Sequence, residues 1–180
     1  MKQQHGVCKS ANKVIHFDDG VSVLALERRD GSVLPCYIDT IDYPSVGVYR
    51  WYAVTQKGEA YATHSCTLSE DAIRMHVLLT GETDQDHRDR NGLNNRRLNL
   101  RPATRSQQGQ NTKLSKNNVL GYRGVYRATD CKTEKYKATI RINGKRQYLG
   151  RFTTAAEAGA VAAEARKKLF GEFAPKEDLQ

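Results

Sequence analysis

The residue types best suited to chemistry gather in one stretch of the chain, residues 86–101. An acid and a histidine stand side by side at Asp86-His87, an Asn91-Gly92 turn follows, and five arginines lie in the same stretch. Three asparagines come after the turn, at Asn94, Asn95 and Asn99. Hydrolysis of a phosphodiester needs an activated water, a Lewis acid on the scissile phosphate and charge relief for the leaving oxygen. The stretch therefore predicts a site that holds one divalent metal ion against a phosphodiester.

Asp86 and His87 offer two complementary groups for this chemistry. The carboxylate of Asp86 provides a hard, anionic oxygen for Mg²⁺ or a similar ion. If both residues end a strand, His87 points to the opposite side, where its imidazole accepts a proton from water at neutral pH. The side-chain amides of Asn94, Asn95 and Asn99 can donate or accept hydrogen bonds and can orient neighbouring groups. A short helix is predicted over residues 105–111, capped by Thr104 and carrying Gln107, Gln108 and Asn111.

Non-catalytic interpretations must be weighed for the Asp86-His87 pair and for His76. An Asp-His pair before an Asn-Gly turn also occurs in ordinary loops, where the aspartate caps the turn. The full spacing through Asn99 and residues 103–106 favours the chemical interpretation instead. His76 lies within an apolar run and fits a packed structural role better than a catalytic one.

Charge and cysteine content narrow the class of protein. Residues 1–85 carry 8 Lys and Arg against 11 Asp and Glu, and residues 86–180 carry 21 against 9, within a net charge of +9. A domain-sized basic half predicts a polyanionic partner. No apolar run approaches the ~20 residues that span a bilayer, and no signal peptide or membrane association is expected. The four cysteines lie far apart, which argues against a zinc site or disulfide framework and favours a reducing, cytoplasmic location.

The first part of the chain alternates in short runs typical of antiparallel strands. Strands are predicted at 21–27 and 32–38 around a turn at 29–31, and at 49–54 and 59–64 around Lys57-Gly58. A further run follows at 73–79, and 43–48 is expected to be a loop. We predict an N-terminal β region over 1–72, the chemical motif over 73–111 and a linker over 112–117.

The remainder predicts a sheet with one helix. Three strands are expected at 122–127, 135–142 and 145–152, the last two joined by an Asn143-Gly144 hairpin turn. Thr154 and Glu157 form the signature of a capping box, and Gly171 follows the last apolar pair of an alanine-rich helix. This β-β-β-α unit, with the helix across one face of the sheet, is predicted over 118–174, followed by a tail at 175–180. The expected fold class of the whole chain is α+β.

The motif resembles the HNH endonuclease family, in particular its phage and homing-type branch. The resemblance rests on Asp86-His87, Asn94-Asn95-Arg96, Asn99-Leu100-Arg101 and the Ala-Thr-Arg-Ser-Gln run from Ala103, with Met75–Leu78 similar to the run that precedes the motif. It implies a ββα fold around one metal ion. It further implies that Asp86 binds the metal, that His87 is the general base, and that Asn99 orients or supports it. The third motif position, usually His or Asn, falls on Gln108, with Asn111 one turn on as the alternative ligand.

Residues 118–174 resemble the AP2 DNA-binding domain, a module often attached to HNH nucleases. The resemblance rests on Gly124-Val125, on Leu149-Gly150-Arg151-Phe152 before the capped helix, and on the closing Phe170–Phe173. Alternation predicts one cationic sheet face that enters the major groove, where arginines read guanine edges and lysines grip phosphates. We predict that the residues facing DNA are Arg123, Arg127, Lys137, Arg141, Arg146 and Tyr148. A solvated face without a partner is the plainer alternative.

The sequence thus predicts a metal-dependent endonuclease that uses Mg²⁺ or Mn²⁺, with double-stranded DNA as its substrate and partner. Nicking and double-strand cleavage are both compatible with one such site. The alternative is a sequence-specific DNA-binding protein whose nuclease site has degenerated at Gln108. A third interpretation, RNA binding, rests on the tyrosines of the sheet, because aromatic rings stack on unpaired bases.

Overall fold

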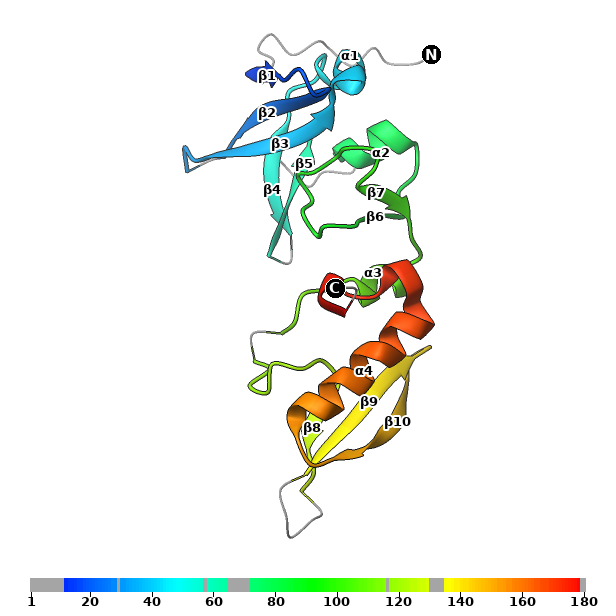
Figure 1. The fold of residues 1–180 in the computed structure, drawn as a ribbon. Coiled ribbons are helices and arrows are strands. Elements are labelled where there is room, and N and C mark those ends of the chain that lie inside the picture. The colour runs from blue at the N-terminus through cyan, green and yellow to red at the C-terminus, as the bar shows by residue number, and fades with distance from the viewer. Residues whose placement is uncertain are drawn as a thin grey trace. The chain divides into compact units, whose positions relative to one another are not determined.

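The chain divides into two compact units, residues 1–104 and 105–180, which are described separately. The computed structural model describes residues 12–28, 30–56, 58–64, 72–115, 117–129 and 135–178. Several small antiparallel sheets and short helices make up the fold (Figure 1). This mixed architecture of helices and antiparallel strands agrees with the predicted fold class. None of the described helices is long and apolar enough to cross a bilayer.

The first unit opens with a three-stranded antiparallel sheet. Its strands are β1 (Val14–His16), β2 (Val21–Glu27) and β3 (Val33–Asp39), in the order β1-β2-β3. The two longer strands fall where alternation predicted them. Leu24 and Leu26 of β2 and Cys36 and Ile38 of β3 are buried, while the residues between them are partly exposed. One face of this sheet therefore belongs to the core.

A second hairpin pairs β4 (Tyr52–Gln56) with β5 (Glu59–Thr63). Lys57 of the predicted turn lies outside the described residues, and Gly58 has the left-handed φ of 84° that the turn requires. Strand β4 begins three residues later than predicted. Trp51, just before it, is buried and donates from Nε1 to the Val46 carbonyl, 2.8 Å away.

Two segments of the first unit differ from the sequence prediction. The expected loop at 43–48 contains a short helix, α1 (Tyr43–Val46), which continues the 3-10 turn η1 (Thr40–Asp42). The run at 73–79, expected as a further strand, forms the helix α2 (Met75–Thr80). Short apolar runs do not distinguish strand from helix by periodicity. The left-handed Gly81, whose N–H donates to the Val77 carbonyl, ends this helix.

One core joins the predicted N-terminal region to the chemical motif. Met75 of α2 and Leu93 pack with the buried residues of β2 and β3, together with Trp51. The last strands of the unit are β6 (Gln85–His87) and β7 (Leu100–Pro102), an antiparallel pair. The division of the chain between residues 104 and 105 differs from the predicted linker at 112–117, which lies inside the second unit.

The second unit contains the short helix α3 (Arg105–Gln110) and a three-stranded sheet. The strands are β8 (Val125–Arg127), β9 (Tyr136–Ile142) and β10 (Lys145–Phe152), antiparallel in the order β10-β9-β8. The Asn143-Gly144 turn has φ values of 49° and 77°, as a type I′ hairpin requires.

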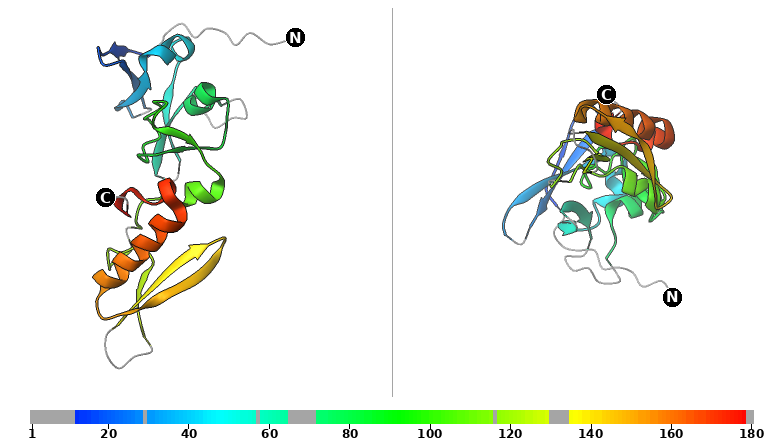
Figure 2. Two further views of the ribbon diagram at one scale, coloured as in Figure 1. Left: turned by 45° about the vertical axis from the view of Figure 1, so that its right-hand side comes forward. Right: turned by 90° about the horizontal axis from the view of Figure 1, so that it is seen from below.

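Helix α4 (Ala155–Phe170) packs along this sheet, as two views in Figure 2 show. The predicted capping box is present: the Thr154 hydroxyl accepts from the Glu157 N–H at 3.2 Å, and the Glu157 carboxylate accepts from the Thr154 N–H at 3.3 Å. Ala158 and Ala162 meet Val125 and Ala138 in a small core. The 3-10 turns η2 (Gly171–Phe173) and η3 (Lys176–Asp178) follow.

Candidate active site

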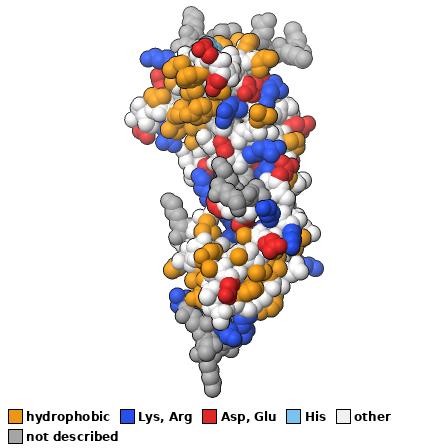
Figure 3. All heavy atoms as spheres, in the orientation of Figure 1, with side chains coloured by type: hydrophobic (Ala, Val, Ile, Leu, Met, Phe, Trp, Pro, Cys, Tyr) orange, Lys and Arg blue, Asp and Glu red, His pale blue; other side chains and the backbone are white. Residues whose placement is uncertain are grey.

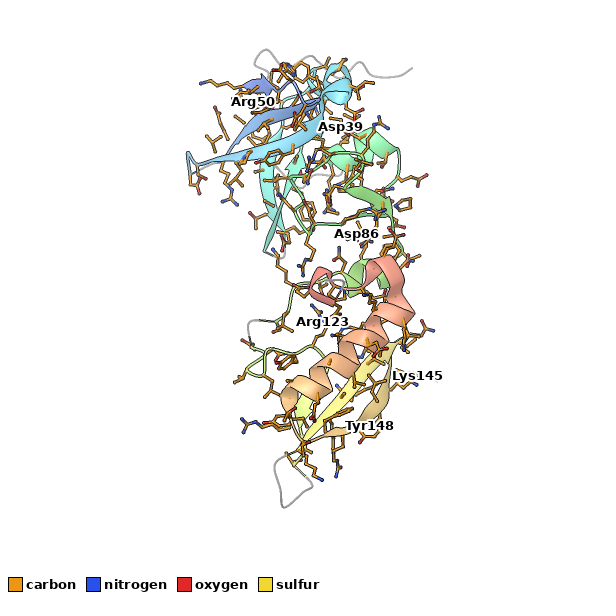
Figure 4. The ribbon with its side chains drawn as sticks, in the orientation of Figure 1. Asp39, Arg50, Asp86, Arg123, Lys145 and Tyr148 are labelled. Atoms are coloured by element: carbon orange, nitrogen blue, oxygen red, sulfur yellow. The ribbon has the colours of Figure 1, made fainter. Side chains whose placement is uncertain are left out.

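Strand register pairs Asp86 with Arg101. Asp86 on β6 lies directly opposite Arg101 on β7, so both side chains project from the same face (Figure 4 labels Asp86). Arg101 donates from Nε and from Nη2 to the same carboxylate oxygen, at 2.9 and 2.6 Å. Only 5% of the Arg101 side chain and 11% of the Asp86 side chain are exposed. The carboxylate predicted to bind a metal ion is therefore engaged by a buried guanidinium.

His87, the next residue on β6, has different neighbours. The residue is 6% exposed, and its ring meets that of His76 of α2 edge to face, with ring centroids 5.3 Å apart and an interplanar angle of 84°. Tyr61 of β5 lies 6.0 Å from the His87 ring and 6.4 Å from that of His76. The three rings form an aromatic cluster that holds the imidazole of His87 inside the unit.

Burial sets the protonation of both histidines. It lowers the pKa of His87, against the opposing effects of a hydrogen bond to Asn95 and the charges of Asp89 and Asp86. Burial likewise lowers the pKa of His76 to about 3, helped by the charge of His87 and then that of Arg74. Both rings are neutral at neutral pH. A neutral imidazole is the form that accepts a proton from water.

The loop between β6 and β7, residues 88–99, is folded around Asp89. The carboxylate of Asp89 accepts from the Asn91 N–H at 2.9 Å, from Asn94 Nδ2 at 2.6 Å and from Asn99 Nδ2 at 2.9 Å. Asn99 also accepts from the Asp89 N–H at 3.0 Å and donates to the Asn94 carbonyl at 2.7 Å. The hydrogen bonds of the Asn99 side chain thus go to the loop itself. They give the loop a fixed shape beside His87.

The loop is docked on the N-terminal sheet. The Tyr37 N–H of β3 donates to the Leu93 carbonyl and the Asn95 N–H donates to the Tyr37 carbonyl, both at 2.8 Å. On the other side, a Cβ at Gly92 would stand 2.5 Å from the Ala60 carbonyl oxygen of β5, so the turn needs glycine there. Strands far from the motif in sequence therefore position it.

Asn95 is the asparagine that the structure places beside the histidine. Its Oδ1 lies 3.4 Å from His87 Nε2, and its side chain is almost fully buried. The sequence marked Asn95 only as one of several amides. Its contact with Cys36 of β3, 59 positions away, could not be found from local spacing.

A comparison with known proteins gives one further observation. The chain is 28% identical over 164 residues to the "Uncharacterized HNH endonuclease L560" of Acanthamoeba polyphaga mimivirus, a match that covers 87% of this chain and 81% of that protein. A match of this length takes in residues from both units. No family model and no solved structure matches.

The other predicted metal ligand belongs to the second unit. Gln108 lies on α3, and the alternative, Asn111, follows that helix and is 5% exposed. Within the described ranges, no group of three or more His, Cys, Asp and Glu side chains is arranged to hold a metal ion.

Four of the six residues predicted to face DNA share the open face of the second sheet. The register sets Arg141 opposite Arg146, and Tyr148 opposite Thr139, next to Lys137 on the same side. Two further residues join this face, since Tyr126 and Arg151 both pair with Lys137. The guanidinium of Arg146 lies 5.1 Å from the centre of the Tyr126 ring. We call Tyr126, Lys137, Arg141, Arg146, Tyr148 and Arg151 the open-face cluster.

The predicted grouping of Arg127 with this face is wrong, whereas Arg123 lines a pocket together with Tyr126, Arg141 and Arg146 of the cluster. Val125 is buried beneath α4, so Arg127, two residues on, belongs to the helix-bearing face and pairs with Tyr136. Arg123 precedes the strand, behind a left-handed Gly124, and its guanidinium donates to the Thr112 hydroxyl and carbonyl.

Strand alternation did not predict Arg151 on the open face because β10 contains a bulge. The pairing of β10 shifts between Tyr148 and Gly150, which places Gly150 opposite Ala138 and brings Arg151, rather than Gly150, to the open face. Figure 3 shows Lys and Arg side chains on the surface of both units, on the side that it draws.

Proposed function

We propose that this chain is a metal-dependent endonuclease of the HNH type that cleaves double-stranded DNA. One observation carries the proposal: a carboxylate and a neutral, buried imidazole stand on consecutive residues of β6, held by a loop that is rigidly hydrogen-bonded around Asp89. His87 would accept the proton of the attacking water. The likeness to a protein named HNH endonuclease supports the same activity.

Asp86 would hold Mg²⁺ or Mn²⁺ through its carboxylate. Hard oxygen donors of this kind fit such ions. The bound ion supplies Lewis acidity to the scissile phosphate and stabilises the leaving oxygen. Arg101 would share the carboxylate with the ion, and its positive charge keeps Asp86 in a fixed orientation on β6.

DNA binding would rest on the second unit, as an AP2-like module. The open-face cluster combines four cations with two tyrosines on one side of a twisted sheet, opposite the helix. Cations spaced along such a face contact phosphates and base edges in the major groove. Binding would supply the site choice that a small nuclease motif lacks.

A non-catalytic DNA-binding protein is the second candidate. Two observations favour it: the ion pair that engages Asp86, and glutamine at the position where the family usually carries His or Asn. Both candidates predict duplex binding that weakens with salt. Strand breakage separates them.

The test is cleavage of supercoiled and genomic DNA in Mg²⁺ or in EDTA. The proposal predicts metal-dependent breaks that disappear in His87→Ala and persist in His16→Ala, a histidine on the exposed edge of the first unit. Tight binding without breaks in either Mg²⁺ or Mn²⁺ would instead establish the non-catalytic candidate.

A further inference from the structure

Four buried side chains form a line of contacts that ends at the imidazole of His87. Cys36 Sγ lies 3.6 Å from Met75 Sδ, Asn95 Nδ2 lies 3.4 Å from Cys36 Sγ, and Asn95 Oδ1 lies 3.4 Å from His87 Nε2. Met75 and Cys36 are fully buried and Asn95 is 1% exposed. The line therefore runs from the core of the N-terminal sheet to the proposed general base.

Met75 determines which group is the donor and which the acceptor along this line of contacts. A thioether has no hydrogen to donate, so Met75 Sδ can only accept, and the thiol of Cys36 is the donor in their contact. Burial raises the pKa of Cys36 to about 12, which keeps that hydrogen on the sulfur. With its hydrogen directed to Met75, Cys36 Sγ presents lone pairs to the next group in the line.

The amide of Asn95 is oriented by this sulfur. An amide has two chemically different ends, and only its NH₂ group donates. The NH₂ group faces Cys36 Sγ, so the carbonyl oxygen faces His87. The Asn95 backbone is fixed by its own hydrogen bond to the Tyr37 carbonyl of β3. Reversing the amide would set its NH₂ group against His87 and its oxygen against a sulfur whose hydrogen points elsewhere.

We propose that Met75, Cys36 and Asn95 together hold the neutral His87 ring in its Nε2–H tautomer, with the lone pair on Nδ1. An oxygen that faces Nε2 is a favourable neighbour when that nitrogen carries a hydrogen, and a repulsive one when it carries a lone pair. Asn95 is then a positioning residue for His87. The catalytic meaning of this arrangement rests on the proposed function: Nδ1 would be the atom that takes the proton from water.

The tautomer can be read directly in the full chain by NMR with ¹⁵N-labelled histidine, without DNA or metal. Long-range ¹H–¹⁵N correlations identify which ring nitrogen carries the hydrogen, and loss of a signal in His87→Gln assigns the residue. We expect His87 to be protonated at Nε2. A ring protonated at Nδ1 would overturn the inference.

The variant Met75→Leu tests whether the thioether acceptor of Met75 fixes the orientation of the Asn95 amide. Leucine has a volume similar to that of methionine, and cores usually tolerate this exchange. Leucine, however, offers no acceptor to the Cys36 thiol. The thiol can then donate to Asn95, the amide can reverse, and we expect the Nδ1–H form to rise from undetectable to a share comparable with the other form. Asn95→Leu should release the same form, unless it fails to fold, in which case Met75→Leu decides.

Leu26→Ile is the control, because it exchanges side chains of equal volume in the same core, adds or removes no acceptor, and pairs in register with Leu34 rather than with a residue of the line. It should leave the tautomer unchanged. If Met75→Leu behaves like this control, the proposed role of Met75 is wrong. If the chain cleaves DNA, Met75→Leu should lower kcat about twofold without changing DNA affinity, because about half of the rings then carry the wrong tautomer. A chain that never cleaves DNA would refute the proposed function and leave the tautomer assignment intact.

Discussion

At the scale of single residues, Arg101 engages the carboxylate of Asp86, and Asn95 faces the imidazole of His87. Asp86 and His87 could be recognised because they are adjacent and because carboxylate and imidazole are the groups that the chemistry needs. Their partners, Arg101 and Asn95, depend on strand register and on contact with β3. Neither dependence is encoded in local spacing, so the roles of these two residues required the structure.

The Asp86–Arg101 pair should be costly to break from one side. Arg101→Leu would leave a buried carboxylate without its cation, and we expect a loss of about 3–5 kcal/mol in the free energy of unfolding. The measurement is urea denaturation, with Arg50→Leu as the control, since the Arg50–Glu27 pair is far more exposed and should contribute about 0–1 kcal/mol. Equal losses in the two variants would contradict the importance given to the buried pair.

His76 should make the stability of the first unit depend on pH. Its pKa is about 3 in the folded chain, against an ordinary value of 6.5, so between these values the unfolded chain binds a proton that the folded chain does not. Stability is then complete above about pH 6.5 and falls as the pH drops toward 3, by at most about 1.4 kcal/mol per pH unit.

Denaturation at a series of pH values tests this dependence. In His76→Leu the slope should become shallower, while His87, whose pKa is also lowered by burial, keeps a part of it. An unchanged slope in the variant would show that His76 is not the group responsible.

At the scale of elements, turn and cap residues were the reliable signals. Asn143-Gly144 and the Thr154–Glu157 capping box each specify backbone geometry through a few neighbouring residues, and both appear where predicted. The run at 73–79 failed as a strand because its length and apolar pattern suit either structure. The prediction that Arg127 lies on the open face was wrong, because alternation carries no information about which side of the sheet the helix covers.

The close contact between Gly159 of α4 and the Tyr122 ring can be tested by substitution. A Cβ at Gly159 would stand 2.3 Å from a ring carbon of Tyr122, so Gly159→Ala should lose about 1–3 kcal/mol despite the better helix propensity of alanine. Gly109→Ala in α3 is the control, because a Cβ there meets nothing within 4 Å. Thermal denaturation of both variants measures the difference. A stabilised Gly159→Ala would mean that Tyr122 moves aside without cost.

At the scale of the whole molecule, the chain forms two compact units, whereas an N-terminal β region, a separate chemical motif and a C-terminal sheet after a linker at 112–117 were expected from the sequence. The reason is that the loop at 88–99 shares a core with β2 and β3, so the N-terminal strands and the motif form one unit. Such long-range packing has no local sequence signal. The division at residue 104 also assigns α3 to the unit that carries the open-face cluster.

DNA affinity should follow the open-face cluster. Arg141→Ala should weaken duplex binding and reduce the slope of log affinity against log salt by about 0.9 if the side chain contacts one phosphate. Arg127→Ala removes the same charge from the helix-bearing face and should have a smaller effect. Salt titrations of binding to one duplex measure both. A larger effect of Arg127→Ala would place the DNA on the other face of the sheet.

The central claim is that His87 acts on a phosphodiester, and single-turnover cleavage of bound duplex DNA in saturating Mg²⁺ tests it most directly. With the DNA affinity of each protein measured in parallel, His87→Ala should bind as tightly as the unchanged chain and cleave at least about 100-fold more slowly, because it lacks the group that accepts the proton. Cleavage at an equal rate by His87→Ala would contradict the account and move the chemistry to other residues.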